Sequence, residues 1–94
     1  MVRVLIERRL APGQEQAVKQ AMVELRQDAI DIPGYVSGET LRDSDDPLRF
    51  IVISTWTSRA RWEAWAKSEA RLRREANVLP LLSETEKVTV LEYV

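Results

Sequence analysis

The sequence contains no histidine and no cysteine among its 94 residues. These absences exclude the serine and cysteine nucleophile systems that depend on a histidine base, and they exclude disulfides. They also exclude zinc sites of the usual Cys/His type and a haem iron held by histidine or cysteine. Any chemistry must come from tryptophan, tyrosine, arginine, carboxylate or hydroxyl side chains, or from a bound cofactor. We predict neither a metal nor a cofactor.

Strong charge of one sign and long apolar runs are also missing. The 14 basic and 15 acidic residues give a net charge of −1, so the chain lacks the basic surface with which proteins bind nucleic acid or an anionic membrane. No stretch reaches the roughly 20 apolar residues that span a bilayer, and the first residues contain no apolar run of signal length. We expect a cytoplasmic protein with no nucleic-acid or membrane partner, folded as one domain over residues 1–94.

Two spacings of apolar residues divide the chain into strands and helices. Alternation with a period of two predicts strands, whereas steps of three and four residues predict amphipathic helices. Pro12-Gly13 and Pro33-Gly34 interrupt the pattern. The expected strands cover about 2–9, 35–42, 48–56 and 85–93, and the expected helices cover about 14–30 and a region after residue 58, with helical propensity continuing over 68–77.

The segment 54–58, Ser-Thr-Trp-Thr-Ser, joins a strand to a helix. Before it, both faces of the strand are largely apolar, which is typical of a strand covered on both sides. After it, Ser58 or Thr57 is suited to cap a helix, and Trp62 and Trp65 follow on one helical face. We expect this helix to direct both indole rings toward the sheet.

Asp43, Asp45 and Asp46 lie between the second and third expected strands. Clustered carboxylates suggest a cation site, but this segment lacks the glycine and the terminal glutamate of a calcium-binding loop. Aspartates followed by Pro47 are typical of a turn. We therefore predict a hairpin turn here rather than a metal site.

The order βαββαβ is typical of the ferredoxin-like α+β fold, in which two helices cover one face of a four-stranded antiparallel sheet. The other face then stays bare, and Leu5, Ile51 and Ile53 place apolar side chains on it. Such a patch is unusual on a soluble monomer. We therefore predict a homodimer in which two sheets pack face to face around a two-fold axis.

Four local motifs accompany this order: Pro12-Gly13, Pro33-Gly34-Tyr35, Thr55-Trp56-Thr57-Ser58 and, over 62–68, Trp-Glu-Ala-Trp-Ala-Lys-Ser. With them the chain resembles the antibiotic biosynthesis monooxygenase family over nearly its whole length. The resemblance implies a dimeric α+β barrel with a small apolar pocket between sheet and helices in each subunit. Members of that family include monooxygenases of aromatic polyketides and quinols, haem-degrading enzymes, and proteins without known activity.

The haem-degrading branch of that family pairs an asparagine on the first strand with a tryptophan on the second helix and an axial histidine about ten residues later. Trp65 matches this tryptophan, but Arg8 stands at the asparagine position and Glu75 lies near the histidine position. The iron ligand is therefore lost. We expect no haem-degrading activity.

Four aromatic residues are candidates for binding a small ligand. The resemblance places Trp65 in the pocket, where an indole offers a flat apolar face and one N–H donor, although a tryptophan that only packs in the core would point the same way. For Trp56 and Trp62 we favour packing, at the end of a buried strand and on the helix face. Tyr35 follows a turn and either lines the pocket or closes its rim.

Two charged residues complete the candidate set. Arg8 shares a strand face with the apolar residues of the first strand, and it either reaches a negative or carbonyl group of a ligand or, as we favour, extends to water. Glu75 lies among Arg71, Arg73 and Arg74. That neighbourhood is more typical of a solvated ion-pair network than of a catalytic acid or base.

Two functions fit these residues. The first is a cofactor-independent monooxygenase of a small aromatic substrate, such as a quinol or a polyketide, in which the substrate carbanion itself reduces dioxygen inside a dry pocket. Trp65 would orient the ring and Arg8 would stabilise negative charge, but no general base is evident. The second is a non-catalytic dimeric domain that binds a small hydrophobic ligand. We favour the enzyme on the resemblance alone.

Overall fold

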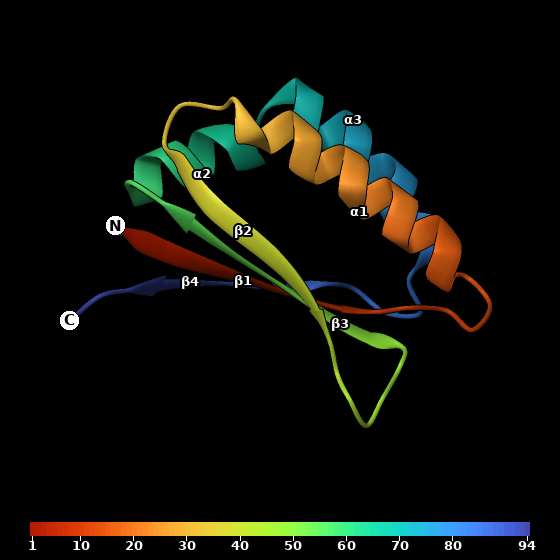
Figure 1. Ribbon diagram of the computed structural model, residues 1–94. Helices are drawn as coiled ribbons and strands as arrows, with labels where there is room; N and C mark the ends of the chain where they lie inside the picture. The colour runs from red at the N-terminus through yellow and green to blue at the C-terminus, as the bar shows by residue number, and fades with distance from the viewer.

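The computed structural model describes residues 1–94 and contains four strands and three helices (Figure 1). The predicted order of strands and helices is confirmed, and each expected strand is found with its ends within two residues of the predicted ones. No helix of the chain is both long enough and apolar enough to span a membrane. The elements are β1 (Val2–Arg9), α1 (Glu15–Ile30), β2 (Tyr35–Arg42), β3 (Arg49–Trp56), α2 (Arg59–Ala66), α3 (Glu69–Val78), a 3₁₀ turn (Leu79–Leu81) and β4 (Lys87–Glu92).

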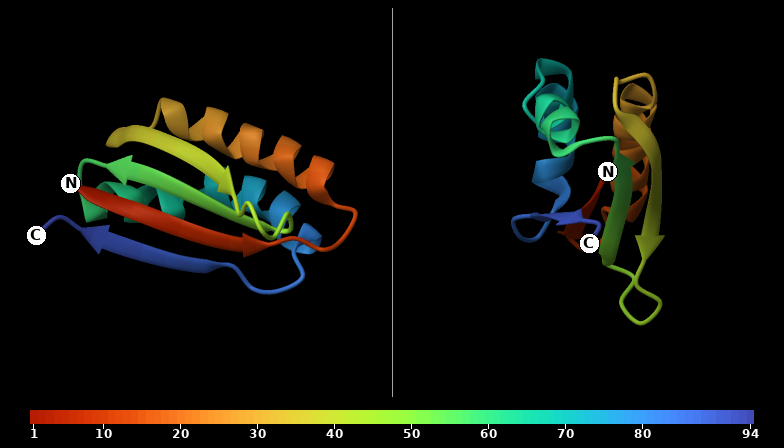
Figure 2. Two further views of the ribbon diagram at one scale, coloured as in Figure 1. Left: turned by 60° about the horizontal axis from the view of Figure 1, so that its bottom comes forward. Right: turned by 90° about the vertical axis from the view of Figure 1, so that its left-hand side faces the viewer.

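The strands form one sheet in the order β2-β3-β1-β4, and every neighbouring pair is antiparallel. This is the ferredoxin-like arrangement that the sequence predicted. All helices lie on one face of the sheet, with α1 beside α3 (Figure 1; Figure 2). The molecule therefore has two layers, and any pocket between them is closed by the sheet on one side and by helices on the other.

Strict alternation along β1 defines the inner face of the sheet. Val2, Val4, Ile6 and Arg8 are buried beneath the helices, whereas the residues between them are at least partly exposed. The apolar stripe predicted for α1 is confirmed, because Val18, Ala21, Met22, Leu25 and Ala29 are its buried residues. The main core cluster joins both layers through Val2, Val4, Ile6, Ala21, Leu25, Ala29, Trp56, Trp62, Trp65 and Val78.

The second predicted helix is split in two, which differs from the two-helix layer that the sequence predicted. Ser58 caps α2, because its hydroxyl accepts a hydrogen bond from the backbone N–H of Arg61 at 3.1 Å. Ser68 caps α3 in the same way through Arg71 N–H at 3.2 Å, and it donates its own hydroxyl to the carbonyl oxygen of Trp65 at 2.7 Å. A side chain that satisfies the first N–H groups of a new helix stabilises the break between the two.

Gly34 brings the start of β2 close to α2. Its φ angle of +95° lies in the region that favours glycine. A Cβ atom at this position would lie 2.5 Å from Cβ of Arg61, so a larger residue would push the helix away. The Pro33-Gly34 motif therefore sets the position of Tyr35, the next residue, relative to α2.

The acidic segment between β2 and β3 is a hairpin turn, as predicted. The backbone N–H of Asp45 donates to Oδ1 of Asp43 at 2.9 Å, and that of Leu48 donates to Oδ1 of Asp46 at 3.1 Å. The Arg49 guanidinium also pairs with Asp43. These carboxylates are thus used to hold the turn.

The outer face of the sheet is covered by no part of the chain (Figure 1; Figure 2). Leu5, Ile51 and Ile53 are partly exposed on it, and Leu41 and Leu91 are exposed. The bare apolar face that the sequence predicted is therefore present. Its burial in a homodimer stays a prediction.

Candidate functional site

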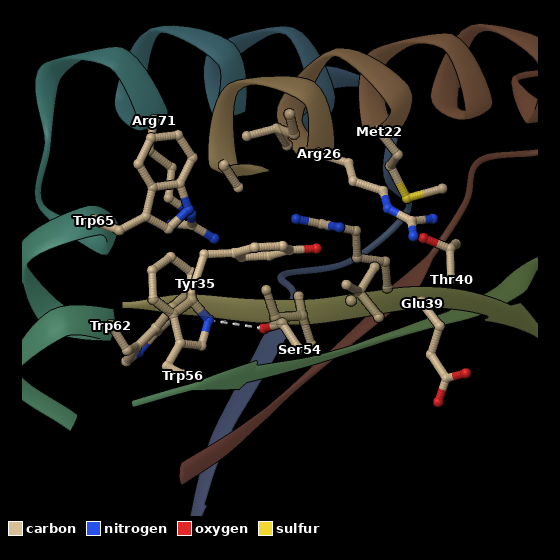
Figure 3. Close-up of a pocket in the computed structure, with 16 residues that line it drawn as sticks. Met22, Arg26, Tyr35, Glu39, Thr40, Ser54, Trp56, Trp62, Trp65 and Arg71 are labelled. Atoms are coloured by element: carbon tan, nitrogen blue, oxygen red, sulfur yellow. Dashed lines mark hydrogen bonds between the residues drawn. The ribbon is translucent and has the colours of Figure 1, made fainter. Parts of the chain in front are cut away.

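A pocket of about 70 Å³ lies between the inner face of the sheet and the helices (Figure 3). Strands β1, β2 and β3 supply its floor, and α1, α2 and α3 supply its roof. Apolar side chains make most of the wall, and the few polar groups are mainly arginines and hydroxyls. The lining residues include Ile6, Arg8, Met22, Arg26, Tyr35, Gly38, Glu39, Thr40, Ser54, Trp56, Trp62, Trp65 and Arg71.

One end of this pocket is a wall of aromatic rings. Trp56, the last residue of β3, is 1% exposed, and its Nε1–H donates to the Ser54 hydroxyl at 3.1 Å (Figure 3). Its ring meets Tyr35 edge to face with centroids 5.4 Å apart and meets Trp62 with centroids 5.7 Å apart. Such pairs add about 0.5–1.5 kcal/mol beyond the area they bury. The packing role that we favoured for Trp56 and Trp62 fits these contacts, but both rings also line the pocket.

Trp65 and Tyr35 differ in how firmly they are held. Trp65 is 4% exposed, packs in the core cluster and also lines the pocket. The two roles that we considered for it, core packing and lining the pocket, are therefore compatible. Tyr35 is only half-buried, and its ring extends across the pocket (Figure 3). Its hydroxyl reaches Gly38, where an added Cβ would lie 2.6 Å from the phenol oxygen. Tyr35 therefore lines the pocket and occupies part of its space.

The other end of the pocket is closed by a buried arginine. Arg8 is 3% exposed, so our expectation that it extends to water is wrong. Its Nε donates to Oε2 of Glu86 at 2.8 Å, and its Nη2 donates to Oε1 of Glu75 at 3.2 Å. Strand β4 begins at Lys87, two residues later than predicted, and Glu86 before it is free to turn toward Arg8.

The solvated network predicted around Glu75 is also wrong, because Glu75 is 5% exposed. Its neighbour Arg73 pairs instead with Glu69, and Arg74 pairs with Asp28. The break before α3 rotates this helix so that Glu75 faces the sheet. The sequence alone gave no reason to bury a carboxylate within a run of arginines.

Glu75 and Glu86 both accept hydrogen bonds from Arg8, and each side chain shifts the pKa of the other. Burial raises the pKa of Glu86, and the hydrogen bond to Glu75 raises it further, although Arg8 acts in the opposite direction. Burial alone would raise the pKa of Glu75 as well, but the hydrogen bond from Glu86 and the charges of Arg8 and Arg71 hold it below its ordinary value. Of the two carboxyl groups, Glu86 is therefore the one that takes up a proton first as the pH falls.

Arg71 is the site residue that sequence reasoning missed. It is 8% exposed, and its guanidinium lies 5.1 Å from the ring centroid of Trp62. Its Nη2 is 3.4 Å from Oε2 of Glu75 but has no hydrogen-bond partner, although the atom is buried. Burial lowers the pKa of Arg71, while Glu75 counteracts this shift. A buried N–H without a partner costs about 1–3 kcal/mol.

The reason for the omission is the break between α2 and α3. In one continuous helix with about 3.6 residues per turn, a residue nine positions after Trp62 points to the opposite face. Only the new helix that begins after Ser68 brings Arg71 back to Trp62. The signal that was present is Ser68 followed by Glu69, a capping residue followed by an acidic first turn.

A family model described as antibiotic biosynthesis monooxygenase matches residues 1–74. Among curated proteins, the chain is 25% identical over 84 residues to protein SchA of Streptomyces halstedii and 28% identical over 71 residues to the 42.8 kDa protein in the whiE locus of Streptomyces coelicolor. These matches cover 89% and 76% of this chain. The chain spans only 22% and 18% of the lengths of these relatives.

Solved structures share the fold over nearly the whole chain. Rv0793 from Mycobacterium tuberculosis superposes with a TM-score of 0.89 at 20% identity, covering 99% of this chain and 94% of that protein. SnoaB, a cofactor-independent oxygenase from Streptomyces nogalater, superposes with a TM-score of 0.86 at 15% identity, covering 99% and 93%. At these identities the likeness establishes the fold alone, and the chemistry must be argued from the pocket.

Proposed function

This chain belongs to the antibiotic biosynthesis monooxygenase family, and we propose that it is a cofactor-independent monooxygenase of a small aromatic substrate of the quinol or polyketide type. The observation that carries the proposal is the pocket itself, which is lined by four aromatic rings and two buried arginines, Arg8 and Arg71. Its fold is shared with SnoaB, a cofactor-independent oxygenase. This reaction requires an apolar site with few polar groups.

In the proposed reaction, an activated CH₂ carbon of the ring loses a proton and leaves a delocalised carbanion. The carbanion reduces dioxygen and a C–O bond forms; the proton released in the first step returns to the terminal peroxide oxygen and gives a hydroperoxide. Loss of water then leaves a carbonyl group, so that one oxygen atom enters the product and the other leaves as water with both hydrogens of the carbon. The chain contributes by excluding bulk water and by stabilising the negative charge.

In this proposal the aromatic wall orients the substrate and Arg71 stabilises the carbanion. Trp56, Trp62 and Trp65 present apolar ring surface to a planar substrate. Arg8 is less suited to this role than we first expected, because its Nε donates to Glu86 and its Nη2 donates to Glu75. A positive charge beside the site of charge development contributes more in a low-dielectric pocket than in water.

The pocket is too small for a two-ring substrate with Tyr35 in its present position. A cavity that holds benzene measures about 150 Å³, roughly twice the space found here. Since Tyr35 is half-buried and extends across the pocket, we propose that its side chain moves when substrate enters. Tyr35 would then act as the rim of the site.

One observation favours the second candidate, a non-catalytic domain that binds a small hydrophobic ligand. No carboxylate faces the pocket, because Glu39, the one acidic residue along its wall, directs its side chain away (Figure 3). Oxygen uptake separates the two functions. We expect the protein to accelerate dioxygen consumption by a dihydroxynaphthalene or an anthrone above its autoxidation, with one labelled oxygen atom in the product. Saturable binding with no added oxygen uptake would establish the non-catalytic domain instead.

We further propose that two copies of the chain associate through the outer face of the sheet. The apolar side chains of Leu5, Ile51 and Ile53 lie there without cover. Light scattering coupled to size exclusion is expected to give about twice the chain mass of 10.8 kDa. Ile53→Asp would bury a carboxylate in this interface, and we expect it to yield monomers or unfolded protein. A parent protein that elutes as a monomer would contradict the proposal.

A further inference from the structure

Arg71 has a nitrogen that makes no hydrogen bond within the chain, although it lies 3.4 Å from Oε2 of Glu75. Its Nη2 is buried and without a hydrogen-bond partner, and it is the only buried side-chain nitrogen or oxygen in this condition. The arginine is nine-tenths buried, so solvent does not replace the missing partner. Orphaned buried donors are rare in native proteins and usually point to a ligand or an ordered water.

The orphaned group belongs to the pocket. Arg71 is one of its lining residues, and in Figure 3 its side chain extends from α3 past Trp65 toward Tyr35. Trp62 lies against the guanidinium at 5.1 Å and limits its movement. The donor is therefore held in place before any ligand arrives, which reduces the entropy lost on binding.

The approach to the pocket carries positive charge as well. A groove between α1 and β2 shares Arg26 and Thr40 with the pocket and is also lined by Lys19 and Arg42. No acidic residue lines this groove. All three cations are exposed, and none of them takes part in an ion pair. A groove of one charge sign concentrates ligands of the opposite sign.

We propose that the pocket binds a planar aromatic ligand that carries a negative charge, a carboxylate or an ionised phenol, and that Arg71 binds the anionic group. The aromatic rings recognise the planar part, and the orphaned N–H accounts for the charge. In the inner cluster Arg8 binds both Glu75 and Glu86, so Arg71 is not the main cation of either carboxylate. The inference names the substrate class of the proposed function and rests on the same pocket.

Binding of matched probes tests the inference. Naphthoate and naphthamide have the same shape and differ in charge, and ionised naphthol serves as the phenolate arm. Quenching of tryptophan fluorescence and calorimetry are expected to show that the parent protein binds naphthoate at least about tenfold more tightly than naphthamide, because hydrogen bonds to charged groups are strong. A similar preference for the ionised phenol over its neutral methyl ether would indicate that both anions are accepted.

Two arginines of α3 give a variant and its control. Arg71→Met keeps an unbranched side chain and removes the charge, so the preference for naphthoate is expected to disappear while naphthamide still binds. Arg73→Met makes the same change of charge at an exposed position of the same helix, where the arginine pairs with Glu69, and should keep the preference. Arg71→Lys retains the charge and is expected to keep part of the preference for naphthoate over naphthamide.

Three results would overturn the inference. They are equal affinity of the parent for naphthoate and naphthamide, an unchanged preference in Arg71→Met, and no binding of either probe. Binding with the expected preference but without oxygen uptake from any quinol would refute the proposed enzyme and leave the anion site intact. Turnover of a neutral quinol by a parent protein that shows no charge preference would support the proposed enzyme and refute the anion site.

Discussion

Arg8 and Arg71 approach one pocket from different elements, β1 and α3, and are 3% and 8% exposed. Arg8 donates hydrogen bonds to Glu75 and Glu86, whereas Nη2 of Arg71 lies 3.4 Å from Glu75 and makes no hydrogen bond. Two arginines with nearly equal burial therefore have different roles. Arg8 ties β1, α3 and the segment before β4 together, and Arg71 keeps an N–H group that can bind a ligand.

The difference follows from where each partner lies in the chain. Glu75 is four residues after Arg71 on α3, and Glu86 precedes the edge strand β4, so both converge on the end of β1. Arg71 instead emerges at the start of α3, beside Trp62. The pocket thus has a charged end that supports the fold and an aromatic end that faces the ligand.

The largest effect is expected at the charged end. Arg8→Ala leaves Glu75 and Glu86 buried without their main cation, and removal of one partner of a buried pair typically costs about 3–5 kcal/mol. Urea denaturation should show this loss in the free energy of unfolding. Arg71→Met should cost much less, because Arg8 continues to hold Glu75.

A control for general charge effects is Arg59→Ala. Arg59 pairs with Glu63 on the exposed surface of α2, where solvent screens the interaction, so its loss should have little effect on stability. If Arg8→Ala were no more destabilising than Arg59→Ala, or if Arg71→Met were the more destabilising of the two buried variants, the division of roles between the two arginines would be wrong.

The next effect is expected at the aromatic end. Trp65→Phe should weaken naphthoate and naphthamide alike, by about twofold to tenfold, because it removes ring contact that does not depend on charge. Trp62→Phe should weaken naphthoate more than naphthamide, because Trp62 holds the guanidinium of Arg71. Fluorescence titration of both variants with both probes measures the two effects. If neither variant differs from the parent, the ligand lies elsewhere and Trp65 is a core residue.

Alternating and helical patterns were enough to predict the sheet and its faces. They place Arg8 on the inner face with Val4 and Ile6, because the period of two in a strand leaves no other choice. They also predicted the buried stripe of α1 and the acidic hairpin turn. These features depend on neighbours close in sequence, which is why a single sequence was sufficient.

The electrostatics of the site could not be predicted in the same way. The partners of Arg8 lie 67 and 78 residues away, and whether they are buried depends on the break before α3 and on the late start of β4. Shifts of one or two residues at these ends decide which charges face the sheet. As a result, the sequence identified Arg8 and Glu75 as candidates but predicted the wrong surroundings for both.

The smallest effect concerns the proton at the charged end, and Glu86→Gln isolates it. Groups from two elements face Glu86: Arg8 of β1, and Glu75 and Arg71 of α3. Glutamine can keep both hydrogen bonds, since its oxygen accepts from Arg8 and its amide donates to Glu75. The variant therefore removes the titration and keeps the contacts.

The sign of the pH effect follows from the raised pKa of Glu86, which is caused first by burial and then by the hydrogen bond to Glu75. The folded protein binds this proton more tightly than the unfolded chain, so the contribution to stability is complete below the unfolded value of 4.5 and is lost as the pH rises through the folded value. Glutamine does not titrate, so the stability of Glu86→Gln relative to the parent should rise as the pH increases from 4.5 through the raised pKa of Glu86. The lowered pKa of Glu75 acts in the opposite sense but is present in both proteins.

Urea denaturation across this pH range measures the difference in stability between Glu86→Gln and the parent. The exposed variant Glu84→Gln is the control and should follow the parent. A difference that stays flat or falls with pH would contradict a raised pKa for Glu86.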